Sequence, residues 1–202
     1  MDQEAMYSGA VQAMLPMESP RLRLRGFSVR DAPTFAAYRS DPAVARYQDW
    51  ESCTFVEATA FIRRQRRQIP GTPGRWTQIA IALPPMDTLI GDCGVFVHPE
   101  ARQATIAVTL SRPYQGQGYA GEALTALLDH LFRHQEMHRV QAEVDPRNRP
   151  SWTLLERLGM RREGHRVAGT WFKGEWADDY WYAILREEWL AQCAPHQAPQ
   201  CG

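Results

Sequence analysis

The chain has 202 residues, of which 44% are apolar and 23% charged, a composition typical of one globular domain. Basic and acidic side chains number 23 each, so the chain lacks the basic excess expected of a nucleic-acid-binding protein. The first 20 residues have neither the basic start of a signal peptide nor an apolar run that could span a membrane. We therefore expect a cytoplasmic protein with no nucleic-acid or membrane partner.

The cysteine pattern agrees with a reducing compartment. The four cysteines form no C-x-x-C pair, and no group of histidines and cysteines has the spacing of zinc ligands. They are Cys53, Cys93, Cys193 and Cys201. We expect unpaired thiols and no metal.

The first half of the chain favours one strand followed by helices. Residues 21–25 alternate between polar and apolar, as in a half-buried strand. A helical stretch follows Asp31, and Asp41 with Pro42 predicts a second, short helix, because Asp caps a helix and Pro fits its first turn. Apolar residues at helical spacing predict a longer helix over residues 54–68.

In the second half of the chain, the spacing of apolar residues changes from that of helices to that of strands, with helices between the later strands. The expected elements, in order, are strands over residues 75–83, 88–97 and 104–110, a helix over 118–134, a strand over 139–144, a helix over 149–158 and a strand over 179–185. This order predicts an α+β fold with a central mixed, mostly antiparallel sheet flanked by helices. We expect one domain over residues 19–190, with tails over 1–18 and 191–202.

A glycine-containing turn joins a predicted strand to the N-terminus of an amphipathic helix. The turn consists of Gln115, Gly116, Gln117, Gly118, Tyr119 and Ala120. A helix N-terminus exposes unpaired N–H groups, and glycine lets the backbone approach an anion closely, so the turn predicts a phosphate or pyrophosphate site. Tight-turn glycines without a ligand are the alternative for this segment alone. A Rossmann site would need a third glycine and a Walker site a G-K-[ST] sequence, and neither is present.

A second motif indicates which kind of protein the phosphate site belongs to. Residues 148–160 begin with Asn148 and Pro150, include Ser151 and end with Gly159 and Met160. The two motifs together, Q-x-x-G-x-A and N-x-x-S-x-x-L-x-x-L-G-M, resemble the Gcn5-related N-acetyltransferase (GNAT) superfamily over residues 19–190. Residues 21–25 and 173–176 look most like its ribosomal-protein-alanine acetyltransferase branch.

The resemblance implies a fold with a splay between two parallel strands, and acetyl-CoA as co-substrate. It implies that the glycine turn binds the pyrophosphate and that the strand before it pairs with the pantetheine, through Val108, Thr109 and Leu110. Asn148 would contact the cofactor, and Ser151 would give a proton to the departing thiolate. We take both as catalytic candidates, although Ser151 could also cap its own helix.

The sequence departs from the family at the position of the general base. Many relatives place a glutamate on the strand where this chain has Thr105, which cannot act as a base. The remaining candidates are Asp92, Glu143, Asp145 and Glu163, then His98 and His165, or water without a dedicated base. Trp50 and Asp92 are the candidates for contact with the substrate.

The sequence therefore predicts an N-acetyltransferase that moves an acetyl group from acetyl-CoA directly to a primary amine. The amine acceptor would be a protein N-terminus or a small molecule. The alternative is an acyl-CoA-binding sensor or scaffold with little turnover, which Thr105 motivates. The acceptor and the oligomeric state, a homodimer included, stay open at this point.

Overall fold

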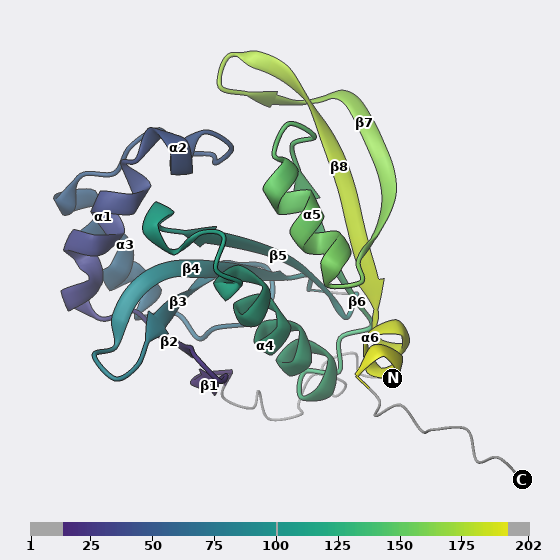
Figure 1. Ribbon diagram of the computed structural model, residues 1–202, viewed down its shortest axis with the longest axis horizontal. Coiled ribbons are helices and arrows are strands. Elements are labelled where there is room, and N and C mark those ends of the chain that lie inside the picture. Colours follow the sequence, from purple (N-terminus) through teal and green to yellow (C-terminus); the bar gives the residue numbers. More distant parts are fainter. Residues whose placement is uncertain (1–13, 100, 194–202) are drawn as a thin grey trace, which may run out of the picture.

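The computed structural model describes residues 14–99 and 101–193 (Figure 1). Its eight strands form one sheet in the order β1-β2-β3-β4-β5-β6-β8-β7, and β5 and β6 are the one parallel pair among them. The strands are β1 (Met17–Glu18), β2 (Arg23–Arg25), β3 (Trp76–Leu83), β4 (Thr88–Val97), β5 (Gln103–Leu110), β6 (Arg139–Val144), β7 (Arg161–Phe172) and β8 (Glu175–Leu185). The predicted α+β fold with a mixed, mostly antiparallel sheet is confirmed.

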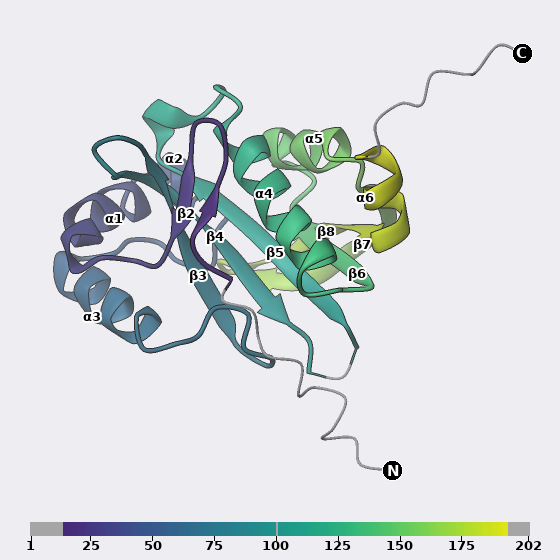
Figure 2. The same cartoon turned by 90° about the horizontal axis from the view of Figure 1, so that it is seen from below.

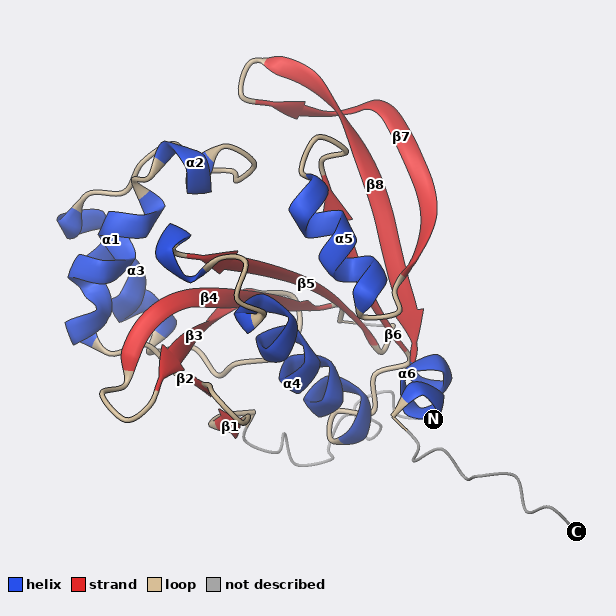
Figure 3. Cartoon of the chain, in the orientation of Figure 1, coloured by secondary structure: helices blue, strands red, loops and turns tan. Residues whose placement is uncertain are grey.

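Helices flank the sheet (Figure 3). They are α1 (Ala32–Arg39), α2 (Pro42–Ala45), α3 (Phe55–Gln65), α4 (Tyr119–Arg133), α5 (Arg149–Arg157) and α6 (Arg186–Gln192), with 3-10 turns η2 (Val29–Asp31) and η3 (Arg112–Tyr114). No helix within the described residues is both long enough and apolar enough to cross a membrane.

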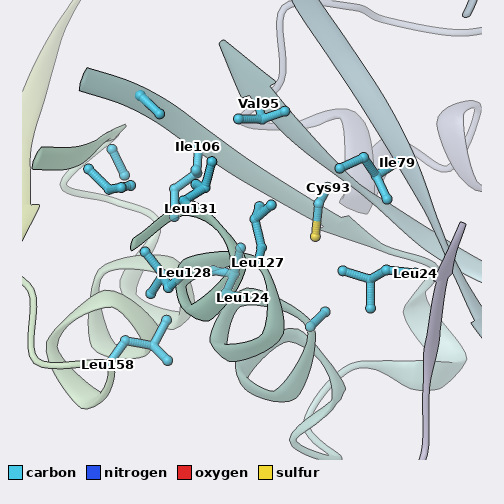
Figure 4. Packing of buried hydrophobic residues seen from close by; sticks show 14 of the residues in the cluster. Leu24, Ile79, Cys93, Val95, Ile106, Leu124, Leu127, Leu128, Leu131 and Leu158 are labelled. Carbon is cyan, nitrogen blue, oxygen red and sulfur yellow. The ribbon is translucent and has the colours of Figure 1, made fainter. Parts of the chain in front are cut away.

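The main core lies between α4 and one face of the sheet. The apolar face of α4 carries Leu124, Leu127, Leu128 and Leu131, all buried (Figure 4). These leucines pack against every second residue of the central strands, including Cys93, Val95 and Ile106. Because side chains alternate across a strand, the intervening residues point to the opposite face. We call the face that carries α4 the helix face.

The opposite face is covered at one end only. A second apolar cluster joins Phe35 of α1 and Ile62 of α3 to Ala80 of β3. In Figure 2, α1 and α3 lie together at the β2–β3 end of the sheet, away from α5 and α6. We call this second side the open face, because beyond α1 and α3 it leads to the half-exposed Gln141 and the exposed Glu143 of β6.

Most predicted elements agree with the observed ones to within a few residues, but β7 and α6 were not predicted. β7 has no buried residue, so it lacks the alternation by which strands are recognised. The short α6 occupies residues 186–192, between the last predicted strand and the expected C-terminal tail.

The predicted tails are described only in part. Residues 17 and 18 form β1, paired with β2. Residues 1–13 and 194–202 lie outside the described part of the chain. The boundaries of the predicted domain stay a prediction.

Candidate functional site

The parallel strands β5 and β6 part after three paired residues. Their register runs from Gln103 opposite Arg139 to Thr105 opposite Gln141 and ends there. Beyond this point, residues 106–110 of β5 and 142–144 of β6 diverge. Backbone groups on the inner edges of such a gap are free to pair with an inserted ligand.

A pocket fills this gap and reaches both faces of the sheet. On the helix face it is lined by Leu124 of α4 and by Asn148, Ser151 and Leu155 of α5. On the open face it is lined by Tyr47, Gln48, Glu143, Thr170, Phe172 and Asp179. Between them lie the edges of β5 and β6, with Ile106, Ala107, Val108, Ala142 and Val144. The pocket therefore passes through the sheet, and a ligand can be approached from either side.

The glycine turn lies at the N-terminus of α4, outside the lining of this pocket. Gly116 and Gly118 have φ angles of 73° and 84°, the left-handed region that glycine adopts without strain. Gly118 is the N-cap of α4, and no side chain caps this helix. The Gln115 side chain donates to the Leu110 carbonyl at 2.9 Å, which fixes the turn to the end of β5. The first turn of α4 therefore presents a positive helix end that can accept an anion.

Arg21, which precedes β2, adds a positive charge beside the turn. Its guanidinium donates to the Gln117 carbonyl at 3.1 Å, pairs with Glu122 at 2.6 Å, and stacks on the Tyr119 ring at 4.5 Å. We did not predict this role, because Arg21 is about a hundred residues away and its alternating segment indicated only a strand.

The N-terminus of α5 forms the other wall on the helix face. Asn148 is its N-cap, but its side chain makes no capping hydrogen bond. Neither the Asn148 amide nor the Ser151 hydroxyl has a hydrogen-bond partner in the described chain, and both residues line the pocket. Trp152 donates to the Pro146 carbonyl at 3.1 Å and holds the preceding loop against the helix. Two polar groups are thus available to a ligand.

Three carboxylates line the pocket, and two of them have ion-pair partners. Arg147 pairs with Asp145 at 2.7 Å, and Arg166 pairs with Asp179 at 3.2 Å. Glu143 has no hydrogen bond or ion pair within the described residues. Although part of the Glu143 side chain is exposed, partial desolvation of its carboxylate by the surrounding protein raises its pKa; the Arg166 charge opposes this shift and the Asp179 charge adds to it. Glu143 is therefore the carboxylate best placed to take up a proton in the pocket.

The other candidate bases are engaged elsewhere. Glu163 is paired with Arg139 of β6 and with Arg161 of β7. His98 is hydrogen-bonded to Thr105 at 2.9 Å, and His165 contacts Asp178 at 2.7 Å. Glu163, His98 and His165 do not line the pocket.

Asp92 and Trp50, the predicted substrate contacts, belong to one network behind the pocket. Asp92 is 2% exposed; its oxygens accept from Tyr38 at 2.5 Å and from Arg39 at 2.7 Å. Burial and the Asp92 charge raise the pKa of Tyr38 well above its usual value. Trp50 stacks on the Arg39 guanidinium, 3.6 Å from the ring centroid, and donates to the Arg39 carbonyl at 3.1 Å. Neither Asp92 nor Trp50 lines the pocket.

Sequence reasoning missed five residues of the open face. Tyr47 and Gln48 lie in the turn after α2, close to Trp50. Thr170, Phe172 and Asp179 come from the β7–β8 hairpin. The aromatic and acidic residues of segment 171–181 are the sequence feature that could have indicated a role in the pocket. Because β7 was not predicted, this segment could not be located relative to the pocket.

Comparisons with known proteins agree on one family. Residues 21–161 match the model of the acetyltransferase (GNAT) domain. The uncharacterized N-acetyltransferase YnaD of Bacillus subtilis (strain 168) is 32% identical over 169 residues, 84% of this chain and 96% of that protein. The [ribosomal protein uS5]-alanine N-acetyltransferase of Escherichia coli (strain K12) is 33% identical over 84 residues, 42% of this chain and 43% of that protein.

A solved structure gives the same result. The crystal structure of a GNAT-family acetyltransferase from Bacillus anthracis superposes with a TM-score of 0.77 and 28% sequence identity. The match covers 86% of this chain and 99% of the other.

Proposed function

The chain belongs to the GNAT acetyltransferase family, whose co-substrate is acetyl-CoA, and we propose that it acetylates a cationic primary amine arriving from the open face. The pocket through the sheet is the observation that carries this proposal. On the helix face the pocket presents the N-terminus of α5 with two free polar groups, and the glycine turn of α4 lies outside its lining; on the open face the pocket presents carboxylates.

Acetyl-CoA would occupy the helix face. Its pyrophosphate would lie at residues 115–120, held by backbone N–H groups and helped by Arg21. Its pantetheine would pair with the free edge of Val108, Thr109 and Leu110 in the gap between the strands. Of these three, Val108 lines the pocket, while the Leu110 carbonyl is engaged by Gln115. The thioester would then reach the level of Asn148 and Ser151.

The transfer would be direct, without a covalent enzyme intermediate. A free amine attacks the thioester carbon, the C–N bond forms, and the C–S bond breaks. The ammonium must first lose a proton, because its pKa is near ~10. Glu143, directly or through water, is the group that would accept this proton. Ser151 would give its proton to the leaving thiolate, and Asn148 would position the cofactor.

The acceptor would be a cation. Glu143 lines the pocket without an ion-pair partner among the described residues, whereas Asp145 and Asp179 are paired with arginines, so the Glu143 charge would attract an ammonium and disfavour acidic molecules. The partial similarity to an enzyme named for alanine acetylation of a ribosomal protein supports a protein N-terminus, and the pocket also admits a small amine. We propose the cytoplasm as the compartment, because Cys53, Cys93 and Cys193 are unpaired.

The test is an assay of CoA release with acetyl-CoA and three acceptor classes: peptides with a free N-terminus, polyamines and aminoglycosides. We expect turnover with at least one class, and Ser151→Ala to lower kcat about 100-fold with little change in the acetyl-CoA KM. Thr153→Ala, two residues along the same helix and outside the pocket lining, is the matched control.

The same assay addresses the sensor alternative. Tight acetyl-CoA binding with no transfer to any acceptor would favour a binding module. Absence of both binding and CoA release would overturn the proposed function altogether.

A further inference from the structure

The tip of the β7–β8 hairpin is a two-residue turn with an unusual residue in it. Lys173 and Gly174 have φ angles of 48° and 87°, and such turns with two positive φ values favour Asn followed by Gly. A lysine in this conformation is strained relative to asparagine or glycine. The backbone conformation of the turn therefore does not favour a lysine at position 173, whereas the contacts of its side chain do.

The Lys173 ammonium joins the hairpin to the opposite wall of the pocket. It donates to the carbonyl of Ala45 and to the carbonyl of Trp50, each at 2.8 Å. Ala45 is the last residue of α2, so the two carbonyls lie at the two ends of residues 46–50. In Figure 1 the hairpin rises away from the rest of the sheet and its tip curves back toward α2. One cation thus spans both ends of a short loop.

That loop carries part of the acceptor wall. Tyr47 and Gln48 line the pocket on one side, and Phe172, the neighbour of the lysine, lines it on the other. The loop is held from within by the contacts of Trp50 with Arg39. From outside it is held by Lys173 and by a hydrogen bond of 3.2 Å from the Tyr47 hydroxyl to the Arg147 carbonyl. Lys173 is the contact that links the loop directly to the hairpin.

Lysine is otherwise missing from this protein. Lysine and arginine together number 23, and Lys173 is the only lysine among them. A compact ammonium with three donors can bond two converging carbonyls, whereas a planar guanidinium presents its donors in a fixed fork. The single lysine of the chain thus occupies a position where an ammonium group suits the two carbonyl acceptors better than a guanidinium group would.

We propose that Lys173 is a positioning residue that fastens the hairpin tip to residues 46–50 and so closes the acceptor end of the pocket. It acts through Tyr47, Gln48 and Phe172 and does not touch the reacting atoms. The proposal rests on the proposed function for its kinetic part. Its structural part, the fastening itself, is independent of any acceptor.

The first experiment compares Lys173→Met and Lys173→Arg with the parent enzyme. For Lys173→Met we expect the acceptor KM to rise about tenfold, since two hydrogen bonds from a charged donor are lost. The Kd for acetyl-CoA, measured by calorimetry, should stay within about twofold, because the cofactor side is untouched. Lys173→Arg keeps the charge and should recover part of the loss.

Hydrogen–deuterium exchange separates this proposal from the proposed function. In Lys173→Met, amides of residues 46–50 and 170–176 should exchange faster, while those of α4 should not change. Unchanged exchange in both segments would overturn the fastening, whatever the enzyme acetylates. Faster exchange with an unchanged acceptor KM would overturn the positioning role.

The single lysine also permits a chemical test of the parent enzyme. An amine-acetylating reagent can modify only Lys173 and the α-amine among the amino groups, and peptide mass spectrometry identifies the site. Acetylation removes the charge and should reproduce the effect of Lys173→Met. Lys173→Arg treated in the same way is the matched control and should not respond. A similar response in both proteins would overturn the assignment to Lys173.

Discussion

The two ends of the pocket are built in different ways. The proposed cofactor end draws on residues 148–155 and on residues 108–120, which lead from the pocket lining to the glycine turn outside it, and would work through backbone groups and helix N-termini. The proposed acceptor end combines segments around residues 47, 143 and 172–179, and would work through side chains and ion pairs. Local geometry fixes the first end and tertiary contacts fix the second. Substitutions at one end should therefore leave ligand binding at the other end unchanged.

The largest expected effect is at the buried anchor behind the acceptor loop. Asp92→Ala would leave the Arg39 charge buried without its carboxylate, and we expect the free energy of unfolding to fall by about 3 kcal/mol. Because Arg39 holds Trp50, the acceptor KM should rise as well, while the acetyl-CoA Kd stays unchanged. Urea unfolding and steady-state kinetics measure these quantities.

An exposed pair provides the control for this substitution. Glu18→Ala removes a carboxylate that pairs with Arg23 where both side chains are about half exposed, and should cost less than about 1 kcal/mol. If Asp92→Ala is no more destabilising than Glu18→Ala, the anchor does not carry the structural role assigned to it. If the acetyl-CoA Kd also changes, the two ends are not separate.

The next effect is confined to the cofactor end. Gly118→Ala places a Cβ on a residue with φ of 84°, which strains the pyrophosphate turn. We expect the acetyl-CoA Kd to rise about tenfold, with the acceptor KM at saturating acetyl-CoA unchanged. Gly121→Ala is the control, since its Cβ would meet Leu154 at an ordinary contact distance of 3.5 Å. Equal effects of the two substitutions would argue against a special role for the turn.

A smaller effect is expected from the charges at the acceptor end. The double variant Glu143→Gln and Asp179→Asn removes two carboxylates from the pocket lining. Because Glu143 is also the proposed proton acceptor, kcat should fall as well, and the electrostatic effect is therefore followed in the acceptor KM. We expect this KM to rise about fivefold at low ionic strength, and the difference to shrink in high salt. Glu136→Gln, an exposed carboxylate outside the pocket lining, should have no effect. An unchanged salt dependence in the double variant would contradict electrostatic attraction of the acceptor.

The smallest effect concerns the stability contribution of Glu143. Partial desolvation raises its pKa in the folded state, so the folded protein holds the proton more tightly than the unfolded chain. Stability is then lost as pH rises above the ordinary glutamate value, and Glu143→Gln should raise the Tm at pH 7. The gain should disappear toward pH 3, below the ordinary glutamate pKa, where the carboxyl is protonated in both states. A gain independent of pH would show that packing, and not ionisation, is responsible.

The same contrast explains which parts of the molecule could be predicted. The turn at Gly116 and Gly118 and the helix start at Asn148 are recognisable because their conformations depend on neighbouring residues in the chain. Tyr47 and Asp179 line the same pocket only once the sheet and the hairpin have formed, and no local sequence pattern predicts that arrangement. Asp92 was predicted to contact substrate, yet its carboxylate is engaged by two partners from α1.

The strand β7 has a practical consequence for changing the enzyme's selectivity. None of its residues is buried, yet Thr170 and Phe172 form part of the acceptor wall. Random substitution of buried positions usually destabilises a protein, whereas exposed positions tolerate change. A combinatorial library restricted to residues 161–172 would therefore explore new acceptors while sparing the folded core. On the proposed function, this strand contributes to the choice of acceptor without contributing to the buried core, which makes it a suitable target for directed evolution.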